Sequence, residues 1–265
     1  MNGGDLVKYL ASDLDGTLLQ EDHTIRKEDV QAILRFKEEG NKLIISTGRP
    51  LEGIKRAFKN YPEIEYDYVV ACNGSVVLDK NDNIIYNNYI NPETAKLIFK
   101  DIVDDKNMFI HFENDGEVYS IESEIKVENE IGIMFSNILP KEVVLKEDGK
   151  YTMISAMAID EDINAAEEMK NNLIEKYGQD VEAFRNQIFV DIAPKNCSKG
   201  IALKSLSEKI GINLEDLYVI GDSYNDISMF EITDKSFTFT YAEDGVKKQA
   251  NNIVNSVAEC INKIL

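Results

Sequence analysis

The first third of the chain alternates short apolar segments with amphipathic segments, and this alternation limits the fold more than any other feature. Residues 8–12, 41–46 and 66–72 are mostly apolar, and each segment runs into a polar or glycine-containing stretch. Residues 25–39 and 51–58 lie between them and carry apolar side chains at helical spacing. This order is typical of a parallel sheet with helices on its faces, and such sheets bind ligands at the carboxyl ends of their strands.

The pattern of elements changes after residue 83. Residues 91–93, Asn-Pro-Glu, are typical of the start of a helix, and Asp162 is expected to cap a second helix that ends at Gly178. Asn-Asp-Gly at 114–116 is a strong hairpin signal, and a second hairpin is expected around Asn186-Gln187. Strands joined by hairpins favour an antiparallel sheet with helices on one side.

The parallel pattern then returns. We expect a helix over 196–211, an apolar strand over 214–220 that ends in acids, a further strand over 235–240, and a last helix from about 246 to 265. The chain is therefore expected to form an α/β core domain from residues 1–83 and 189–265, with an α+β domain inserted at 84–188.

The composition excludes several classes of function. The chain has 265 residues with 48 acidic and 29 basic side chains, and a formal charge of −19. So acidic a chain is unsuited to binding nucleic acid by neutralising phosphates. No apolar run approaches the roughly 18 residues that cross a bilayer, and the polar N-terminus is unlike a secretion signal. We expect a cytoplasmic protein without nucleic-acid or membrane partners, as a monomer or weak homo-oligomer.

Cysteine and histidine are too few and too scattered to indicate a soft-metal site. Cys72, Cys197 and Cys260 are an odd number without C-x-x-C spacing, so neither a disulfide framework nor a zinc knuckle is indicated. His23 and His111 are the only histidines, which makes zinc a poor candidate.

Two pairs of acids follow predicted strands. Asp13 and Asp15 stand two residues apart after the first strand, so both side chains point the same way. Asp222 and Asp226 follow a later strand. Carboxylates that converge at one edge of a sheet repel one another unless a hard dication lies among them, and an oxygen-rich site suits Mg²⁺. An EF-hand calcium loop is excluded because Leu18 occupies the position that requires glycine.

Three further residues are typical phosphate ligands. Thr47 offers a hydroxyl group, Gly48 a backbone N–H, and Lys199 a compact cation at the start of a predicted helix. Each is weak evidence alone, because a single lysine is usually solvated and Thr-Gly is usually a plain turn. Together with the carboxylates they supply a nucleophile, a metal site and phosphate ligands.

This ordered set resembles the haloacid dehalogenase (HAD) superfamily of phosphotransferases, and within it the Cof-like group with a type IIB cap. The resemblance spans the whole chain and implies a Rossmann-like parallel-sheet core with an inserted α+β cap (type C2B). The matching motifs are S-D-L-D-G-T-L-L at 12–19, I-S-T-G-R-P at 45–50, N-G at 73–74, C-S-K-G at 197–200 and G-D-S-Y-N-D at 221–226.

The resemblance implies a Mg²⁺-dependent phosphatase that acts on small phosphate monoesters. Asp13 would be the nucleophile that forms an aspartyl-phosphate, and Asp15 would be the general acid and base. Mg²⁺ would be bound by the Asp13 side chain, the Asp15 backbone carbonyl and Asp222. Asp226 would not bind the metal directly but would orient Lys199. The implied phosphate-binding residues are Leu14, Thr47, Gly48, Lys199 and Asn225.

Two other functions use similar residues. A signalling receiver domain is also phosphorylated on an aspartate, but it is about half this length and has no acid at the position of Asp15. A phosphomutase or another phosphotransferase shares the same core, and only the access of water to the aspartyl-phosphate separates it from a phosphatase. No dinucleotide-binding or P-loop motif is present.

The inserted domain is expected to select the substrate. Arg49, Asn73 and Arg185 are candidate substrate contacts. The resemblance implies a small phosphorylated metabolite such as a sugar phosphate, with flavin mononucleotide or pyridoxal phosphate as alternatives. Two residues depart from the family pattern: Ser223 replaces a common glycine, and Tyr241 replaces a common asparagine.

Overall fold

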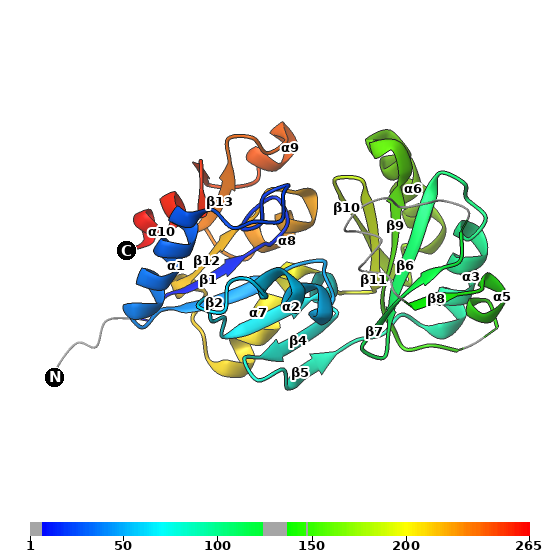
Figure 1. Cartoon of the computed structure of the whole chain (residues 1–265), viewed down its shortest axis with the longest axis horizontal. Coiled ribbons are helices and arrows are strands. Elements are labelled where there is room, and N and C mark those ends of the chain that lie inside the picture. Colours follow the sequence, from blue (N-terminus) through cyan, green and yellow to red (C-terminus); the bar gives the residue numbers. More distant parts are fainter. Residues whose placement is uncertain (1–6, 124–136, 147) are drawn as a thin grey trace.

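The protein forms two sheet-centred domains that lie side by side (Figure 1). In a computed structural model, described over residues 7–123, 137–146 and 148–265, one domain contains an eight-stranded sheet and the other a six-stranded sheet. The chain enters the second domain after β5 and leaves it after β11, so the first domain is discontinuous in sequence. The predicted α/β core with an inserted cap is confirmed.

The core sheet has the strand order β14-β13-β12-β1-β2-β3-β4-β5. Its first six strands are parallel, and β4 and β5 extend the sheet as an antiparallel edge. The strands span Tyr9–Ser12 (β1), Lys42–Ser46 (β2), Tyr68–Ala71 (β3), Val76–Asp79 (β4), Ile84–Asn87 (β5), Leu217–Ile220 (β12), Ser236–Phe239 (β13) and Asn252–Val254 (β14). The carboxyl ends of β1, β2, β3 and β12 therefore meet at one edge.

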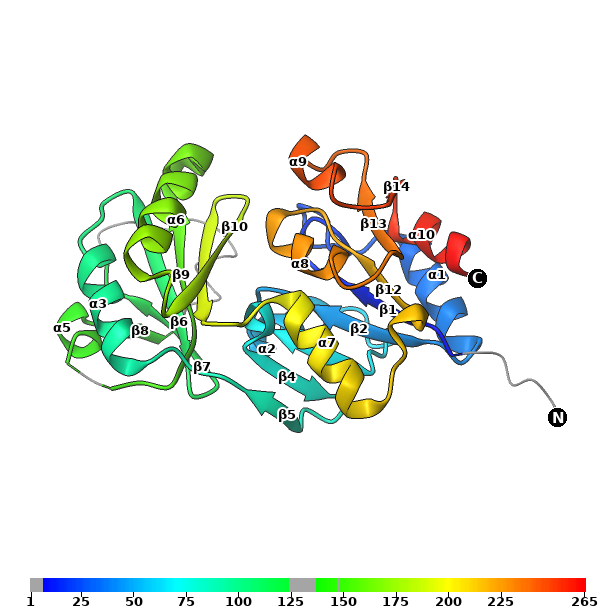
Figure 2. The same cartoon turned by 180° about the vertical axis from the view of Figure 1, so that it is seen from behind.

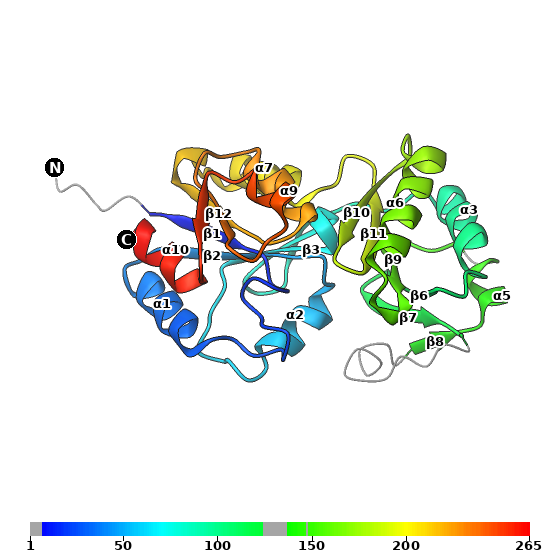
Figure 3. The ribbon, with the colours of Figure 1, turned by 90° about the horizontal axis from the view of Figure 1, so that it is seen from above.

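Helices cover both faces of the core sheet (Figures 2 and 3). Apolar side chains of α1 (Lys27–Glu38), α2 (Leu51–Phe58) and α10 (Val257–Ile264) pack on one face. Those of α7 (Lys199–Ile210), α8 (Ile227–Phe230) and α9 (Asp244–Lys247) pack on the other. Burial on both faces explains why the parallel strands are continuous apolar runs.

The cap sheet has the order β10-β11-β9-β6-β7-β8, and its helices lie on the face away from the core (Figure 3). Its strands span Met108–Asn114 (β6), Glu117–Ile121 (β7), Asn137–Leu139 (β8), Tyr151–Ala158 (β9), Val181–Asn186 (β10) and Phe189–Pro194 (β11). Its helices span Pro92–Ile102 (α3), Lys141–Val144 (α5) and Ile163–Tyr177 (α6). Short 3-10 turns occur at Cys72–Gly74 (η1), Ile159–Glu161 (η2), Leu214–Asp216 (η3) and Tyr224–Asp226 (η4).

The predicted helix starts and hairpins of the cap are confirmed. The Asn91 side chain accepts a hydrogen bond from the Glu93 N–H at 2.9 Å, and Asp162 accepts one from the Asn164 N–H at 2.9 Å. Both caps satisfy backbone donors that a helix start leaves without partners. The turn at 115–116 joins β6 to β7, and β10 pairs with β11 across a two-residue turn.

The predicted domain limits at 84 and 189 each place one strand in the wrong domain. They assign β5 to the cap and β11 to the core. Strand β5 pairs with β4 in the core sheet, and β11 pairs with β9 in the cap sheet. We therefore propose that the cap comprises residues 88–195. The sequence alone assigns these strands wrongly because short apolar strands look alike in either sheet.

The predicted last helix over 246–265 is wrong in its first half. Residues 252–254 form β14, which pairs with β13, and the helix proper is α10. Ser256 follows β14 and caps α10, since its hydroxyl accepts a hydrogen bond from the Glu259 N–H at 3.1 Å. No helix among the described residues is long and apolar enough to span a membrane.

The cap contains a buried carboxyl group whose protonation should influence stability. Glu113 on β6 is 4% exposed and accepts hydrogen bonds from the Thr152 hydroxyl and the Gly116 N–H. Burial raises the pKa of Glu113 from 4.5 to about 7. Because this pKa is higher in the folded state than in the unfolded state, the protonated carboxyl group stabilises the fold. The stabilisation is complete at pH values below the pKa of the unfolded state, and it is lost as pH rises through about 7.

We therefore expect Glu113→Gln to flatten the pH dependence of folding stability. Between pH 5.5 and 8, the free energy of unfolding should fall less in the variant than in the wild type, by about 1–2 kcal/mol. Urea unfolding at the two pH values measures this difference. Glu117→Gln, an exposed change in the same hairpin, is the matched control. Equal pH slopes for wild type and Glu113→Gln would contradict the assignment.

Candidate active site

Asp13 and Asp222 come together because β1 and β12 are neighbours. The two strands pair in parallel up to Ser12 and Ile220, and the Asp13 N–H donates to the Ile220 carbonyl at 2.9 Å. Asp13 is therefore fixed directly beyond the sheet, where it is only 2% exposed. Asp222 lies two residues beyond the end of β12, so the two carboxylates share the carboxyl-end edge of the sheet.

Lys199 lies between two of the predicted acids. Its Nζ atom donates to Asp13 Oδ1 at 2.6 Å and to Asp226 Oδ1 at 2.7 Å, and the side chain is fully buried at the start of α7. Burial alone would lower the pKa of this lysine, but Asp13 and Asp226 outweigh it and raise the pKa above its usual value. Lys199 is therefore a fixed cation.

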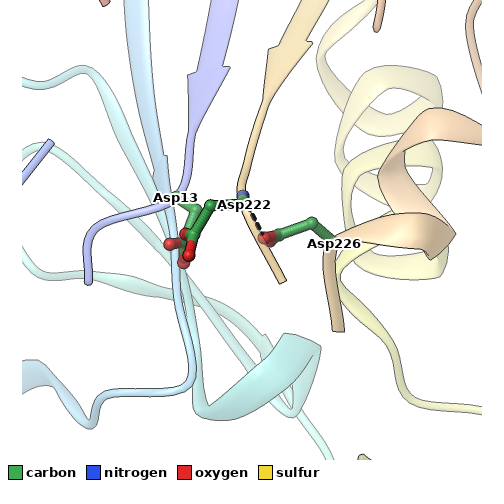
Figure 4. A group of neighbouring side chains, drawn as sticks. All are labelled: Asp13, Asp222 and Asp226. Carbon is green, nitrogen blue, oxygen red and sulfur yellow. Dashed lines mark hydrogen bonds between the residues drawn. The ribbon is translucent and has the colours of Figure 1, made fainter. Parts of the chain in front are cut away.

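Asp226 organises the loop that carries Asp222. Its Oδ2 atom accepts a hydrogen bond from the backbone N–H group of Asp222 at 2.9 Å (Figure 4). The same oxygen accepts one from the backbone N–H group of Ser223, also at 2.9 Å. Both oxygens of Asp226 are thus committed to Lys199 and to this loop. The serine at position 223 fits the pattern because only its backbone N–H is needed for this contact.

Asp13, Asp222 and Asp226 form an acidic group that could hold a cation. One oxygen of each lies within 4.8 Å of the others. Asp222 Oδ1 accepts a hydrogen bond from the Thr17 hydroxyl at 2.8 Å, and neither Asp13 Oδ2 nor Asp222 Oδ2 accepts a hydrogen bond from the described residues. Two carboxylate oxygens are therefore available to a hard cation, which fits the donor set that Mg²⁺ prefers.

The electrostatics of this group favour a bound cation. Burial, followed by the nearby charge of Asp226, raises the pKa of Asp222 to about 7. Burial also raises the pKa of Asp13, against the opposing effect of Lys199. One lysine therefore does not neutralise the three acids, and a dication would supply the missing positive charge.

Gly16 allows the loop after Asp13 to pass close to Asp222. Its φ angle is +78°, and a Cβ atom at this position would lie 2.5 Å from Asp222 Oδ2. The carbonyl of Gly16 also accepts a hydrogen bond from the Tyr241 hydroxyl at 2.6 Å. Tyr241 thus replaces the residue usual in the family with a side chain that anchors the loop that follows Asp13. The Leu14 side chain is buried in the core, so a phosphate could reach only its backbone.

Thr47 and Gly48 follow β2 and lie beside Asn73. The Asn73 N–H donates to the Thr47 carbonyl at 3.1 Å, and the Asn225 amide donates to Asn73 Oδ1 at 3.1 Å. Asn73 has a φ angle of +50°, which asparagine tolerates better than most residues. The four predicted residues of this group are thus held at one edge of the sheet.

Asp191 of the cap joins this group and was not predicted. Its carboxylate accepts hydrogen bonds from Asn73 Nδ2 at 2.7 Å and from the Ser155 hydroxyl at 2.6 Å. A Cβ atom on Gly48 would lie 2.8 Å from Asp191 Oδ2, which explains the need for glycine there. The strand pattern did not assign Asp191 a role, because a single acid within the apolar residues 188–193 does not show which residues of the core it contacts.

Asp15 contacts Arg49 rather than the buried acids. Arg49 Nε donates to Asp15 Oδ2 at 2.7 Å, and a second ion pair joins the Arg49 Nη2 atom to Asp15 Oδ1. The Asp15 charge and hydrogen bond raise the pKa of Arg49, against the effect of burial. Arg49 thus covers the predicted general acid on the side facing the cap.

A cavity of about 380 Å³ lies between the two domains at this point. On the core side it is lined by Asp15, Gly48 and Arg49. On the cap side it is lined by residues of β6, β7, β9, the β10–β11 turn and β11, and Asp191 is among those of β11. The cavity therefore brings cap residues next to the carboxyl-end edge of the core sheet, where a substrate would bind.

Arg185 does not line this cavity, so its position does not support the predicted substrate contact. Its guanidinium group instead joins the domains. It forms ion pairs at 2.9 Å with Glu167 of the cap and with Glu243 of the core, and it lies 4.9 Å from the centre of the Tyr224 ring. Tyr224 belongs to the loop between Asp222 and Asp226, so this contact links the cap to the acidic group.

We expect Arg185→Gln to weaken the closed arrangement of the domains. Charge pairs of this partly exposed kind contribute about 1 kcal/mol, which corresponds to about a fivefold rise in KM. Steady-state kinetics measure the change, which should shrink as salt screens the wild-type pair. Lys141→Gln, which breaks an exposed ion pair with Asp104 inside the cap, is the control. An unchanged KM at low salt would show that the Arg185 contact does not influence substrate binding.

The family model of haloacid dehalogenase-like hydrolases matches residues 10–262. The chain belongs to this family. The resemblance carried by the five motifs is thereby confirmed, and it covers the core and the cap.

Named relatives cover nearly the whole chain. The chain is 26% identical to the 5-amino-6-(5-phospho-D-ribitylamino)uracil phosphatase YwtE of Bacillus subtilis, with 98% of each chain covered. It is 27% identical to the pyridoxal phosphate phosphatase YbhA of Escherichia coli, with 96% of this chain and 97% of the relative covered. A solved structure described as a HAD subclass IIB sugar phosphatase shares the fold, with a TM-score of 0.85 at 20% identity, covering 98% of this chain and 100% of that one. These relatives are consistent with a phosphoric monoester hydrolase.

Proposed function

We propose that this protein hydrolyses small phosphate monoesters through an aspartyl-phosphate on Asp13, with Mg²⁺ as its cofactor. The observation that carries the proposal is the buried Lys199 cation, which holds one oxygen of Asp13 and leaves the other available beside Asp222. A carboxylate fixed in this way beside a cation site is suited to attack a phosphorus atom.

Asp13 would form the new bond to phosphorus while the bond between phosphorus and the leaving oxygen breaks. Asp15 would give a proton to the leaving alcohol and later take one from the attacking water. Arg49 pairs with Asp15 in this structure, so a bound substrate would replace part of the Arg49–Asp15 ion pair. Hydrolysis of the aspartyl-phosphate then releases inorganic phosphate and restores Asp13.

The phosphoryl oxygens would be bound by Lys199, the Thr47 hydroxyl and the Gly48 N–H. Each group stabilises the negative charge that these oxygens carry during transfer. Asn225 would act by supporting Asn73, to which it donates a hydrogen bond. The backbone of Leu14 would complete the phosphate site.

Asp13, Asp222 and the backbone carbonyl of Asp15 would hold the cation. When bound, Mg²⁺ supplies positive charge that reduces the repulsion between a carboxylate and a phosphate dianion. Asp226, with both oxygens already engaged by Lys199 and the 222–223 backbone, would orient these groups rather than bind the metal.

The substrate is proposed to be a small phosphorylated metabolite. The relatives named above act on a phosphorylated ribitylaminouracil, on pyridoxal phosphate and on sugar phosphates, according to their names. The cavity of about 380 Å³ would hold a leaving group of this size. It is too small for a protein substrate that would have to enter between the domains.

Removal of divalent metal tests the proposed cofactor. After dialysis against EDTA, the protein should release no phosphate from p-nitrophenyl phosphate, and millimolar Mg²⁺ should restore turnover. Matched additions of KCl control for ionic strength. Full turnover in EDTA would overturn the metal requirement. A single stoichiometric phosphorylation without turnover would favour the signalling module, and transfer to a second sugar without free phosphate would favour a phosphomutase.

A further inference from the structure

The cavity between the domains is poor in unpaired positive charge. Arg49 and Arg56 are its only lysine or arginine residues within the described chain, and each already contacts a carboxylate. Arg49 pairs with Asp15, and Arg56 pairs with Glu52 at 3.3 Å. The positive groups of the site therefore lie at its phosphate-binding end, with Lys199 and the proposed cation.

The same cavity is rich in acids. Asp15, Glu52 and Asp191 line it, and so do Glu21 of the core and Glu161 of the cap. Among the described residues, two arginines and five carboxylates line the cavity, so this part of the lining carries a formal charge of −3 (2 − 5), its histidines not counted. Of the two histidines that line it, His111 is kept neutral at physiological pH because burial lowers its pKa to about 3.

Asp191 lies directly beside Gly48, one of the proposed phosphate-binding residues. It is 5% exposed, and two hydrogen bonds hold it beside Gly48. Its orientation is therefore fixed before a substrate arrives. A carboxylate in this position accepts hydrogen bonds from hydroxyl or amino groups, and it repels a second anionic group on the same substrate.

The cap wall of the cavity combines apolar and polar side chains. Val118, Met153, Ile188 and Phe189 line it, and the centres of the His111 and Phe189 rings lie 6.2 Å apart in a T-shaped arrangement. Asn186 also lines the cavity, and its buried Oδ1 atom accepts no hydrogen bond from the described residues.

We propose that the leaving group of the substrate carries no second anionic group, so that the enzyme selects monophosphates of neutral or cationic alcohols. Bisphosphates and phosphate esters of hydroxy acids are excluded by Asp191 and the acids around it. This inference rests on the proposed phosphatase function and narrows its substrate class by charge.

Matched pairs of compounds that differ only in charge test this selection. Sorbitol 6-phosphate and 6-phosphogluconate share a six-carbon chain, but the second carries a carboxylate at carbon 1. Each is measured with the Mg²⁺-loaded protein, as a substrate through released phosphate and as a competitor of p-nitrophenyl phosphate hydrolysis. The neutral compound should have at least about tenfold higher kcat/KM, or a correspondingly lower inhibition constant.

The outcomes separate the inference from the proposed function. No turnover of p-nitrophenyl phosphate would overturn the proposed phosphatase itself. Turnover combined with equal or better use of the anionic compound would overturn only the charge selection. Failure of sorbitol 6-phosphate to compete at 10-fold excess over p-nitrophenyl phosphate would also overturn it, because a neutral polyol should fit.

Two variants locate the origin of the selection. Asp191→Asn removes one negative charge while it preserves the shape of the side chain, and it should reduce the preference for the neutral compound by at least about threefold. Glu168→Gln removes the same charge from an exposed position on α6 outside the cavity, and it should leave the preference unchanged. Equal effects of the two variants would assign the selection to the net charge of −19 instead.

Discussion

Asp13→Asn is expected to abolish turnover while the protein stays folded. The substitution keeps the size and most contacts of the side chain, but an amide does not attack phosphorus. Loss of a nucleophile lowers kcat by about 10⁴-fold or more in enzymes that form a covalent intermediate. Phosphate release from p-nitrophenyl phosphate measures the loss, and circular dichroism and thermal unfolding report the fold.

A matched substitution separates chemistry from charge. Asp216→Asn removes one negative charge from the turn before β12, outside the group around Asp13, and should leave kcat unchanged. Binding of a phosphoryl mimic provides a second readout, since wild-type protein should bind beryllium fluoride in the presence of Mg²⁺, as measured by fluorine NMR of the folded protein, and Asp13→Asn should not. Retention of more than about one per cent of wild-type kcat by Asp13→Asn would remove Asp13 from the role of nucleophile.

The residues at the carboxyl-end edge of the core sheet were predictable because the signal is local. An apolar strand that stops at Asp13, Thr47 or Asp222 places that residue at the edge whatever the rest of the chain does. The pairing of β1 with β12 then brings acids more than 200 positions apart in sequence together. The alternation of strands and helices in the sequence already predicts that the carboxyl ends of these strands lie at one edge of the sheet.

The residues of the cap were harder to predict because their role depends on how the two domains dock. Arg185 and Asp191 lie on neighbouring strands, yet one contacts Glu243 at the rim and the other contacts Asn73 inside. A hairpin pattern predicts which side chains lie on the same face of the sheet, but it does not predict which residues of the core domain they contact. The unsupported prediction for Arg185 and the missed Asp191 have this common cause.

The error in the C-terminal helix has a different physical origin. Residues 250–258 carry apolar side chains at helical spacing, but Ile253 and Val254 are β-branched and sit next to the open edge of β13. Pairing with that edge satisfies backbone groups that a helix would satisfy internally. Periodicity in a short segment therefore does not decide between the two structures.

The net charge of −19 and the proposed chemistry are compatible because the charges are arranged unevenly. Lys199 and the proposed cation would place positive charge only where the phosphate would bind, and the acids around the rest of the cavity would face the leaving group. The long-range field opposes the approach of any anion. Added monovalent salt should screen that field and leave kcat/KM unchanged or raise it.

Lys199→Met is expected to lower kcat by about 10²–10³-fold, because it removes a fixed donor from the phosphoryl oxygens. The effect should be on kcat more than on KM, since the lysine stabilises charge that shifts during transfer. The substitution also leaves Asp13 and Asp226 without the cation between them, so thermal unfolding must be measured at the same pH as the kinetics.

Two further variants show whether position or charge accounts for the loss. Lys204→Met changes an exposed lysine one turn later on α7 and should leave kcat within twofold of wild type. Lys199→Arg restores the charge but not the compact shape, and the side chain at this position has no exposed surface into which a guanidinium could extend. Rescue by arginine should therefore fail. A Lys199→Met variant that is folded and retains kcat would show that phosphate is held elsewhere along this edge of the sheet.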